Sequence, residues 1–291
     1  MAMILFLLLN LLAFVGAYGL THFRTPGHLG IGLPRPTNTK LPSNVGLAYV
    51  TQRIAIDRQQ WLETWWIPAP SSPHGTVLLF PGNAGSKAKQ LLAPAQVFHQ
   101  LHYDALLVDF RGMGGSSGNA TTLGAREAQD VVLAVQQVQR LKLQRPLILY
   151  GVSMGSVAIL RAIAHQQVRV DAIILELPFA RMLDAVRSRV RAIGLPAFPT
   201  AELLVFWGSV QHGFNGFAHN PVVDARQVQC PTLLLHGKRD PWTTVAEINQ
   251  IFQNLRGMKQ QVIFPKAGHH LLVTADKKLW EQSIAEFLRK I

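Results

Sequence analysis

The chain has 291 residues, of which 48% are hydrophobic and 15% charged, and its formal net charge is +12 at pH 7. This length fits one large domain with a substantial core, or two small ones. The single cysteine, Cys230, excludes an internal disulfide and a thiolate metal cluster. It precedes an apolar strand pattern, so we expect it to be a buried packing residue.

Residues 2–20 carry no charge and a single amide, Asn10. As a helix, this segment would span roughly 28 Å, close to the thickness of a bilayer core. It can be a transmembrane anchor or a cleavable secretory signal with Val15-Gly16-Ala17 as the cleavage site. The missing basic residues before the apolar run favour the anchor, and the position at the N-terminus disfavours a buried core helix.

Basic residues follow the apolar segment (Arg24, Arg35 and Lys40), which by the positive-inside rule favours a cytoplasmic location for the following domain. We expect a single-pass protein of the bacterial inner membrane, or a secreted or periplasmic one if the segment is cleaved. The positive net charge suits an anionic membrane surface. Nucleic acid is not an expected partner, because the chain has no zinc-finger spacing and no aromatic-basic stacking motif.

Residues 21–44 are rich in Pro, Gly, Thr and Asn and are predicted to be a linker, so the folded domain covers 45–291. Short apolar runs then alternate with helical patterns. The predicted strands are 47–56 and 61–67, which form a hairpin, followed by 76–80, 105–109, 146–150, 170–177, 232–236 and 261–264. The predicted helices are 87–101, with Pro94 kinking or beginning it, 123–141, 153–165 and 278–290. This alternation predicts an α/β fold with a mostly parallel sheet covered on both faces.

Residues 180–220 interrupt this alternation. They contain a basic helix candidate at 180–193 and a cluster of aromatic residues, including Phe198 and Trp207. We interpret the segment as a cap inserted between two strands. An ordinary crossover helix with a long loop is the alternative.

Gly151-Val152-Ser153-Met154-Gly155 lies between a strand pattern and a helix pattern. A serine at such a turn has a strained backbone, and small residues two positions away on each side relieve the crowding. A second Gly-x-Ser-x-Gly match centred on Ser116 lies in a glycine-rich loop with no helix after it. The strand–turn–helix context therefore selects Ser153 as the candidate nucleophile.

A serine nucleophile needs a neighbouring base, and the base needs an acid that orients it. Both should lie on loops at the carboxyl ends of parallel strands. Asp240 follows the strand 232–236, and His269 and His270 follow the strand 261–264. Glu176, at the end of an earlier strand, is another candidate for the acid.

The chain resembles the α/β-hydrolase superfamily, in particular membrane-anchored serine hydrolases of the serine-aminopeptidase-like and depalmitoylase-like group. The matching segments are Trp65-Trp66-Ile67-Pro68, 80–85, 109–116, 151–155, 231–240 and 267–269. The order Ser153, Asp240, His269 is the order of this superfamily. The resemblance implies an α/β-hydrolase fold with a small cap insertion.

The same resemblance selects His269 over His270, because the family's base follows the glycine that closes this loop. It also favours Asp240 over Glu176, because residues 175–179 resemble a structural loop of the family. The family's oxyanion loop usually begins with histidine, which Pro81 replaces here. The backbone N–H groups of Met154 and Asn83 are nevertheless expected to form the oxyanion hole.

Asp109 and Arg111 are expected to form an ion pair that braces a loop. No cofactor is expected, and no zinc spacing occurs among the eleven histidines. The predicted function is hydrolysis of a carboxylic ester or thioester with an acyl or lipid-like substrate through an acyl-enzyme, with residues 2–20 in the membrane. Alternatives are a serine-aminopeptidase-like amidase and a non-catalytic, membrane-tethered binding protein on a hydrolase scaffold.

Overall fold

The computed structural model describes residues 2–24 and 30–291, so residues 25–29 of the predicted linker lie outside it. Its centre is an eight-stranded sheet in the order β10-β9-β8-β7-β5-β6-β4-β3. The strands are β3 (Val50–Ala55), β4 (Trp61–Ile67), β5 (Gly75–Phe80), β6 (Tyr103–Val108), β7 (Leu147–Val152), β8 (Ala172–Glu176), β9 (Thr232–Gly237) and β10 (Lys259–Phe264). β5 to β10 run parallel to their neighbours, whereas β4 is antiparallel to both β3 and β6. The mostly parallel sheet and the opening hairpin are therefore confirmed.

Two apolar cores form because successive side chains of a strand point to opposite faces. In β5, Leu78 and Phe80 pack into one core, and Val77 and Leu79 pack into the other. The helices that contribute to the first core are α3 (Glu127–Arg140), α4 (Met154–Gln166) and α8 (Val245–Asn254). The helices of the second are α2 (Leu92–Gln100) and α10 (Lys277–Leu288). The sheet is covered on both faces, as the alternating pattern predicted.

Two helices begin later than their apolar patterns suggest. The segment Lys87–Leu91 is a π-helical turn, and Pro94 lies in the first turn of α2, where its missing N–H is tolerated. α3 begins at Glu127 rather than near Leu123, because Leu123 has a positive φ of 53°. The Glu127 carboxylate accepts the backbone N–H groups of Thr122 and Gly124 and holds this preceding turn.

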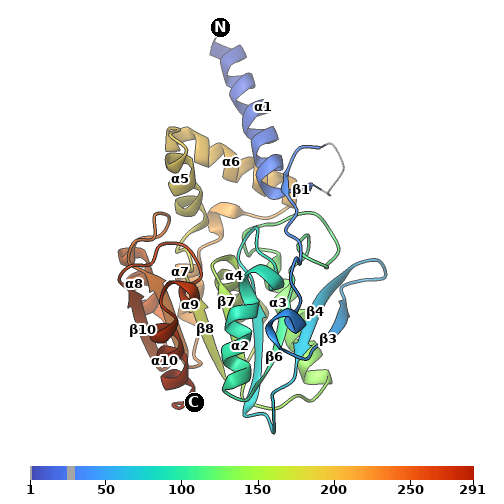
Figure 1. The fold of residues 1–291 in the computed structure, drawn as a ribbon. Coiled ribbons are helices and arrows are strands. Elements are labelled where there is room, and N and C mark those ends of the chain that lie inside the picture. Colours follow the sequence, from blue (N-terminus) through green and yellow to red (C-terminus); the bar gives the residue numbers. More distant parts are fainter. Residues whose placement is uncertain (1, 25–29) are drawn as a thin grey trace.

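The connection between β8 and β9 contains the segment for which the sequence predicts a cap. It includes α5 (Met182–Ala192), α6 (Ala197–His212), the 3-10 turns Gly216–Ala218 and Ala225–Gln227, and α7 (Pro221–Asp224). A further short helix, α9 (Leu272–Ala275), precedes α10, and a 3-10 turn at Pro42–Val45 precedes β3. α5 and α6 stand at the end of the molecule from which the N-terminal helix projects (Figure 1).

The N-terminal helix α1 (Ala2–Thr21) is long and apolar enough, over Met3–Thr21, to cross a membrane. Its first half projects away from the domain (Figure 1). Its second half packs against α6, where Ala13 and Ala17 are buried and Gln211 Nε2 donates a hydrogen bond to the Phe14 carbonyl at 2.8 Å. The helix fits a single-pass membrane segment that also belongs to the packed structure.

The described part of residues 21–44 lies against the domain. The strands β1 (Phe23–Arg24) and β2 (Leu33–Pro34) form a short parallel pair. Arg35 donates hydrogen bonds to the carbonyls of Ser116 and Gly118, the latter at 2.6 Å. Asn38 Nδ2 donates to Asp109 at 2.7 Å. These bonds attach the segment to the loop that follows β6.

Candidate active site

Ser153 lies between β7 and α4 in a strained conformation, with φ 50° and ψ −109°. The two flanking glycines leave no room for a side chain. A Cβ on Gly151 would lie 2.5 Å from the Gly155 carbonyl carbon, and a Cβ on Gly155 would lie 2.5 Å from the Phe80 carbonyl oxygen. This crowding explains why the turn requires glycine at both positions. The turn places Ser153 at the carboxyl end of the sheet.

Three of the predicted site residues are in hydrogen-bond contact. His269 Nε2 lies 3.0 Å from Ser153 Oγ, and His269 Nδ1 lies 2.6 Å from Asp240 Oδ2. The other Asp240 oxygen accepts the backbone N–H groups of Trp242 at 2.8 Å and Thr243 at 3.2 Å. Burial alone would raise the pKa of Asp240, but the hydrogen bond from His269 and these N–H groups outweigh it and hold the pKa below its ordinary value. The carboxylate is thus ionised and fixed beside the imidazole.

The alternative candidates have other contacts. Glu176 is fully buried and accepts hydrogen bonds from Tyr150 Oη at 2.7 Å, Trp280 Nε1 at 2.9 Å and the Leu272 N–H at 2.8 Å. His270 is exposed. Ser116 Oγ donates to the Asp109 carbonyl at 2.6 Å and accepts the Glu63 N–H at 2.8 Å. Glu176 and Ser116 therefore brace loops, and His270 faces solvent. None of the three takes part in the hydrogen-bonded relay formed by Ser153, His269 and Asp240.

The loop after β5 places Asn83 beside the serine. A Cβ on Gly82 would come within 3.3 Å of Ser153 Cβ, which shows how closely the loop approaches. The Gly82 N–H donates to Gln90 Oε1 at 2.6 Å, so a side chain of the π-helical turn before α2 holds the loop although Pro81 replaces the expected histidine. Within the part of the chain that the structure describes, the N–H groups of Asn83 and Met154 donate to no other backbone group. Both are available to a ligand oxygen.

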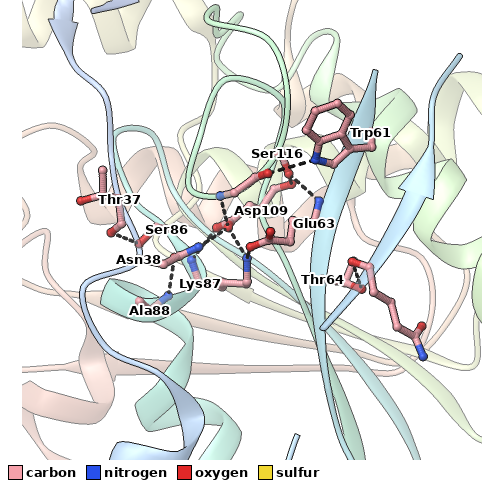
Figure 2. Close-up of polar contacts among 12 residues, drawn as sticks. Thr37, Asn38, Trp61, Glu63, Thr64, Ser86, Lys87, Ala88, Asp109 and Ser116 are labelled. Atoms are coloured by element: carbon pink, nitrogen blue, oxygen red, sulfur yellow. Dashed lines mark hydrogen bonds and ion pairs between the residues drawn. The ribbon is translucent and has the colours of Figure 1, made fainter. Parts of the chain in front are cut away.

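A buried cluster around Lys87 fixes the far end of this loop (Figure 2). The fully buried Lys87 ammonium contacts Asp109, lies 2.8 Å from Glu63 Oε1 and stacks 4.5 Å from the centre of the Trp65 ring. The Lys87 N–H also donates to Asp109 Oδ1 at 2.8 Å. Because the chain reaches Lys87 directly after the Asn83 loop, these contacts hold that loop against the sheet.

The predicted ion pair between Asp109 and Arg111 is wrong. Asp109 turns toward Lys87 in the π-helical turn before α2, whereas Arg111 pairs with Asp130 of α3 at 2.7 Å. The two side chains leave the chain toward different helices, so each finds its partner in a different element. Sequence proximity suggested the pair, but the packing of α2 and α3 determines the partners.

One aromatic and one basic side chain at the site, Trp242 and Arg189, were not predicted from the sequence. The ring of Trp242 packs 4.6 Å from the ring of His269, and the Arg189 guanidinium of α5 lies 4.6 Å from the centre of the Trp242 ring. Burial lowers the pKa of Arg189, and the charge of Asp240 opposes this shift. Trp242 follows Asp240 by two positions, which is the one sequence signal that could have indicated it. Arg189 approaches only through the folding of the cap.

An apolar cavity of about 280 Å³ lies between the cap, α1 and the site. Asn83 and Arg189 lie in its wall, together with Met182, Leu204 and Val205. Larger hollows beside Arg111 and Lys40, of about 410 and 600 Å³, are lined by more polar residues. Ser153, Asp240 and His269 line none of these three spaces, and the apolar cavity approaches them through Asn83 and Arg189. Among residues 2–24 and 30–291, no cluster of three or more His, Cys, Asp or Glu side chains is arranged to hold a metal ion.

Comparisons with known proteins bear on the family and the fold of this chain. Residues 77–281 match the alpha/beta hydrolase family. The uncharacterized protein YqkD of Bacillus subtilis is 27% identical over 223 residues, which are 76% of this chain and 73% of YqkD. The lysophosphatidylserine lipase ABHD12 of Macaca fascicularis is 25% identical over 183 residues, or 62% of this chain, but the match covers only 45% of ABHD12.

Among solved structures, the Pyrococcus furiosus esterase Pf2001 superposes with a TM-score of 0.75 at 20% identity, covering 88% of this chain and 96% of the esterase. At this identity the likeness concerns the fold. The family match, by contrast, spans most of the domain, from β5 into α10. This protein belongs to the alpha/beta hydrolase family.

Proposed function

We propose that this protein is a membrane-anchored serine hydrolase that cleaves a carboxylic ester or thioester of an acyl or lipid-like substrate. The observation that carries the proposal is the continuous hydrogen-bonded relay from Ser153 through His269 to Asp240. The lipase activity in the name of ABHD12 and the esterase activity in the name of Pf2001 support the reaction class. The apolar cavity beside Asn83 supports an acyl substrate.

The relay would act in two stages. Ser153 Oγ attacks the carbonyl carbon while His269 Nε2 takes its proton, and Asp240 stabilises the imidazolium that results. His269 then returns the proton to the leaving alcohol or thiol as its bond to the carbonyl carbon breaks, which leaves an acyl-Ser153 ester. Water, deprotonated by His269, attacks this ester, and the carboxylic acid is released as Ser153 recovers its proton.

The oxyanion of each tetrahedral intermediate would lie between the N–H groups of Asn83 and Met154. Removal of one such donor typically costs about 10²–10³ in rate. Each N–H belongs to a loop held by other contacts, the first through Gln90 and Lys87 and the second through the start of α4. The donors are therefore fixed before the charge develops.

A serine-directed fluorophosphonate probe tests the proposal. It should label the detergent-solubilised wild type and the Ser116→Ala variant, which keeps the candidate nucleophile, but not Ser153→Ala. Hydrolysis of p-nitrophenyl esters should follow the same pattern. Labelling that persists in Ser153→Ala would refute the assignment of the nucleophile. A wild type that neither reacts with the probe nor turns over esters would instead support the non-catalytic binding protein.

The anchoring part of the proposal places α1 in the bacterial inner membrane. Support comes from the length and apolar composition of the helix and from its packing against α6. Cleavage of the segment would remove this packing. Membrane fractionation of the full chain with a C-terminal tag tests this part. A mature protein that begins after Ala17 would contradict it.

A further inference from the structure

We infer that the last turns of α1 form one wall of the acyl-chain pocket, and that the acyl chain of a membrane lipid reaches Ser153 from the bilayer between α1 and the cap. This inference rests on the proposed hydrolase function. In this arrangement, α1 is a substrate-binding element as well as an anchor. The pocket binds one kind of occupant, the acyl chain of a bilayer lipid.

The first support is the composition of the cavity wall. Ala17, Leu20 and Thr21 of α1 line the cavity of about 280 Å³ opposite side chains of α5 and α6. The volume is close to the lower end of the range for small-molecule sites, about 300–1,000 Å³. Since α1 supplies three lining residues, the pocket is incomplete without it.

The second support is the tight contact between α1 and α6. Ala13 and Ala17, four residues apart on α1, are buried, and a Cβ on Gly16 would lie 3.3 Å from Leu204 Cδ2. Small residues at such spacing let two helices approach closely in a membrane. Trp207 Nε1 also donates to Asn10 Oδ1 at 3.2 Å, which gives the amide of the apolar segment a partner. The wall formed by α1 is thus firmly attached to the cap.

The third support is the position of the two ends of the cavity. Leu20, Ile193 and Leu195 line the cavity and are also exposed, at 51%, 72% and 49%, so they mark its mouth. At the inner end, Asn83 and Arg189 lie in the wall, and these residues border the Ser153 relay as described above. An acyl chain lying in the cavity would therefore run from the apolar mouth toward the serine.

The fourth support is the apolar rim around the mouth. α6 is apolar on its outer side as well, where Phe198, Phe206 and Val210 are exposed at 75%, 47% and 55%. A helix that is apolar on all sides is normally covered by protein or by lipid. The first half of α1 projects from the end of the molecule at which α6 lies (Figure 1), and its side chains from Met3 to Leu9 are apolar and exposed. A bilayer covers both surfaces at once, so lipid chains would lie directly at the mouth.

Photo-crosslinking on the unaltered protein tests the path of the chain. A long-chain alkyl fluorophosphonate with a diazirine near the chain end is bound to Ser153 in nanodiscs and then irradiated. We expect crosslinks on the α1 peptide that ends at Arg24 and on α6. Labelling of Ser153 with crosslinks confined to the sheet domain would overturn the inference while the proposed function stands. Failure to label Ser153 at all would instead refute the proposed function.

Substitutions that fill the pocket provide a second test. A Cβ on Gly208, a buried residue that lines the cavity, would meet no atom within 4 Å, so Gly208→Leu should fill the pocket without a clash. Each methylene of the acyl chain that can no longer be buried should weaken binding of the substrate roughly fourfold. We expect kcat/KM for p-nitrophenyl palmitate to fall more than tenfold and that for p-nitrophenyl acetate to stay within twofold.

Matched controls separate the pocket from general effects. Ala192→Leu changes the neighbouring cap helix α5 at an exposed position outside the cavity and should alter neither activity. Leu20→Trp at the mouth should reproduce the selective loss, whereas Leu12→Trp, at an exposed position of α1 outside the cavity, should not. Equal palmitate activity in Gly208→Leu, Leu20→Trp and both controls would overturn the inference.

Discussion

Trp207 in α6 donates its indole N–H to Asn10 Oδ1 in α1 across 3.2 Å, and the two residues are 197 positions apart in the sequence. A polar side chain in an apolar helix is costly unless it is paired. The contact explains why the apolar segment tolerates its one amide, and it connects the membrane helix to the cap. The same two helices are joined by the edge-to-face contact of Phe14 with the Trp207 ring.

We predict that Asn10→Leu and Trp207→Phe are not additive in stability. Each removes the same hydrogen bond, so the double variant should be more stable than the sum of the two losses implies, with a coupling free energy of about 0.6 kcal/mol. Reversible unfolding in mixed detergent micelles measures the cycle. Strictly additive losses would show that the bond contributes nothing to the docking of α1.

Replacement of Lys87 should destabilise the domain strongly. Lys87→Met leaves the buried carboxylate of Asp109 without its cation, which typically costs about 3–5 kcal/mol. The exposed neighbour Lys89 provides the control, because Lys89→Met should change the free energy of unfolding by at most about 0.5 kcal/mol. Denaturant titrations of both variants make the comparison. Equal effects at the two positions would contradict a buried, paired role for Lys87.

The two candidate acids should respond differently to amide substitution. Asp240→Asn should lower kcat by about 10⁴-fold with little loss of stability, because the neutral side chain no longer holds the imidazole in its working tautomer. Glu176→Gln should keep kcat within about tenfold but lose about 1–3 kcal/mol, since an amide cannot accept from all three of its donors. Ester turnover and thermal unfolding of both variants separate the roles. The reverse pattern would make Glu176 the acid.

Trp242 should position the base. Trp242→Ala removes the ring that packs on His269 and leaves the backbone N–H to Asp240 in place, so kcat should fall about tenfold or more through misorientation of the imidazole. Trp242→Phe, which retains an aromatic ring, should recover most of this loss. The value of KM for a short ester should change little. A loss in KM with unchanged kcat would place Trp242 in substrate binding instead.

The contribution of His212 and His219 to stability should fall on acidification from about pH 6.5 toward pH 4. Burial lowers the pKa of both His212 and His219 to about 4, below the ordinary value of about 6.5. In this interval the unfolded chain binds protons that the folded chain excludes, so the stabilising contribution is complete above pH 6.5 and is lost as pH falls. One proton contributes a slope of at most about 1.4 kcal/mol per pH unit.

His219 allows a direct test of this slope. Its Nε2–H donates to the Leu123 carbonyl at 3.1 Å, and its Nδ1 accepts from Arg161 at 3.5 Å, so a second proton would face a cation. His219→Gln should therefore reduce the slope between pH 6.5 and pH 4, as measured by urea titrations across that range. The exposed His270→Gln serves as the control and should retain the wild-type slope. An unchanged slope in His219→Gln would contradict the neutral assignment.

The sheet and the positions of Ser153, Asp240 and His269 could be predicted because they depend on local patterns. An apolar run defines a parallel strand, and the residue that follows it must lie at the carboxyl edge. Lys87, Arg189 and the partners of Asp109 could not be predicted in this way. Their contacts arise only when α2, α3 and the cap pack against the sheet. The spacing of residues along the sequence does not predict that packing.

Cap and anchor show the same limit. Apolar composition predicted a membrane helix at residues 2–20 and an aromatic-rich insertion at 180–220, but it could not indicate that the two would touch. Their contact depends on the small faces of Ala13 and Ala17 meeting α6, a match between surfaces far apart in the sequence.

The buried carboxylate of Glu176 has a consequence for the order in which the molecule is completed. It holds the N–H of Leu272, three residues after His269, and it accepts from Trp280 in the final helix α10. The support of the loop that carries His269 is therefore complete only when α10 has docked. During synthesis, α1 and Ser153 are made well before that helix. Until α10 is made and docked, the chain therefore holds Ser153 while the loop that carries His269 lacks part of its support.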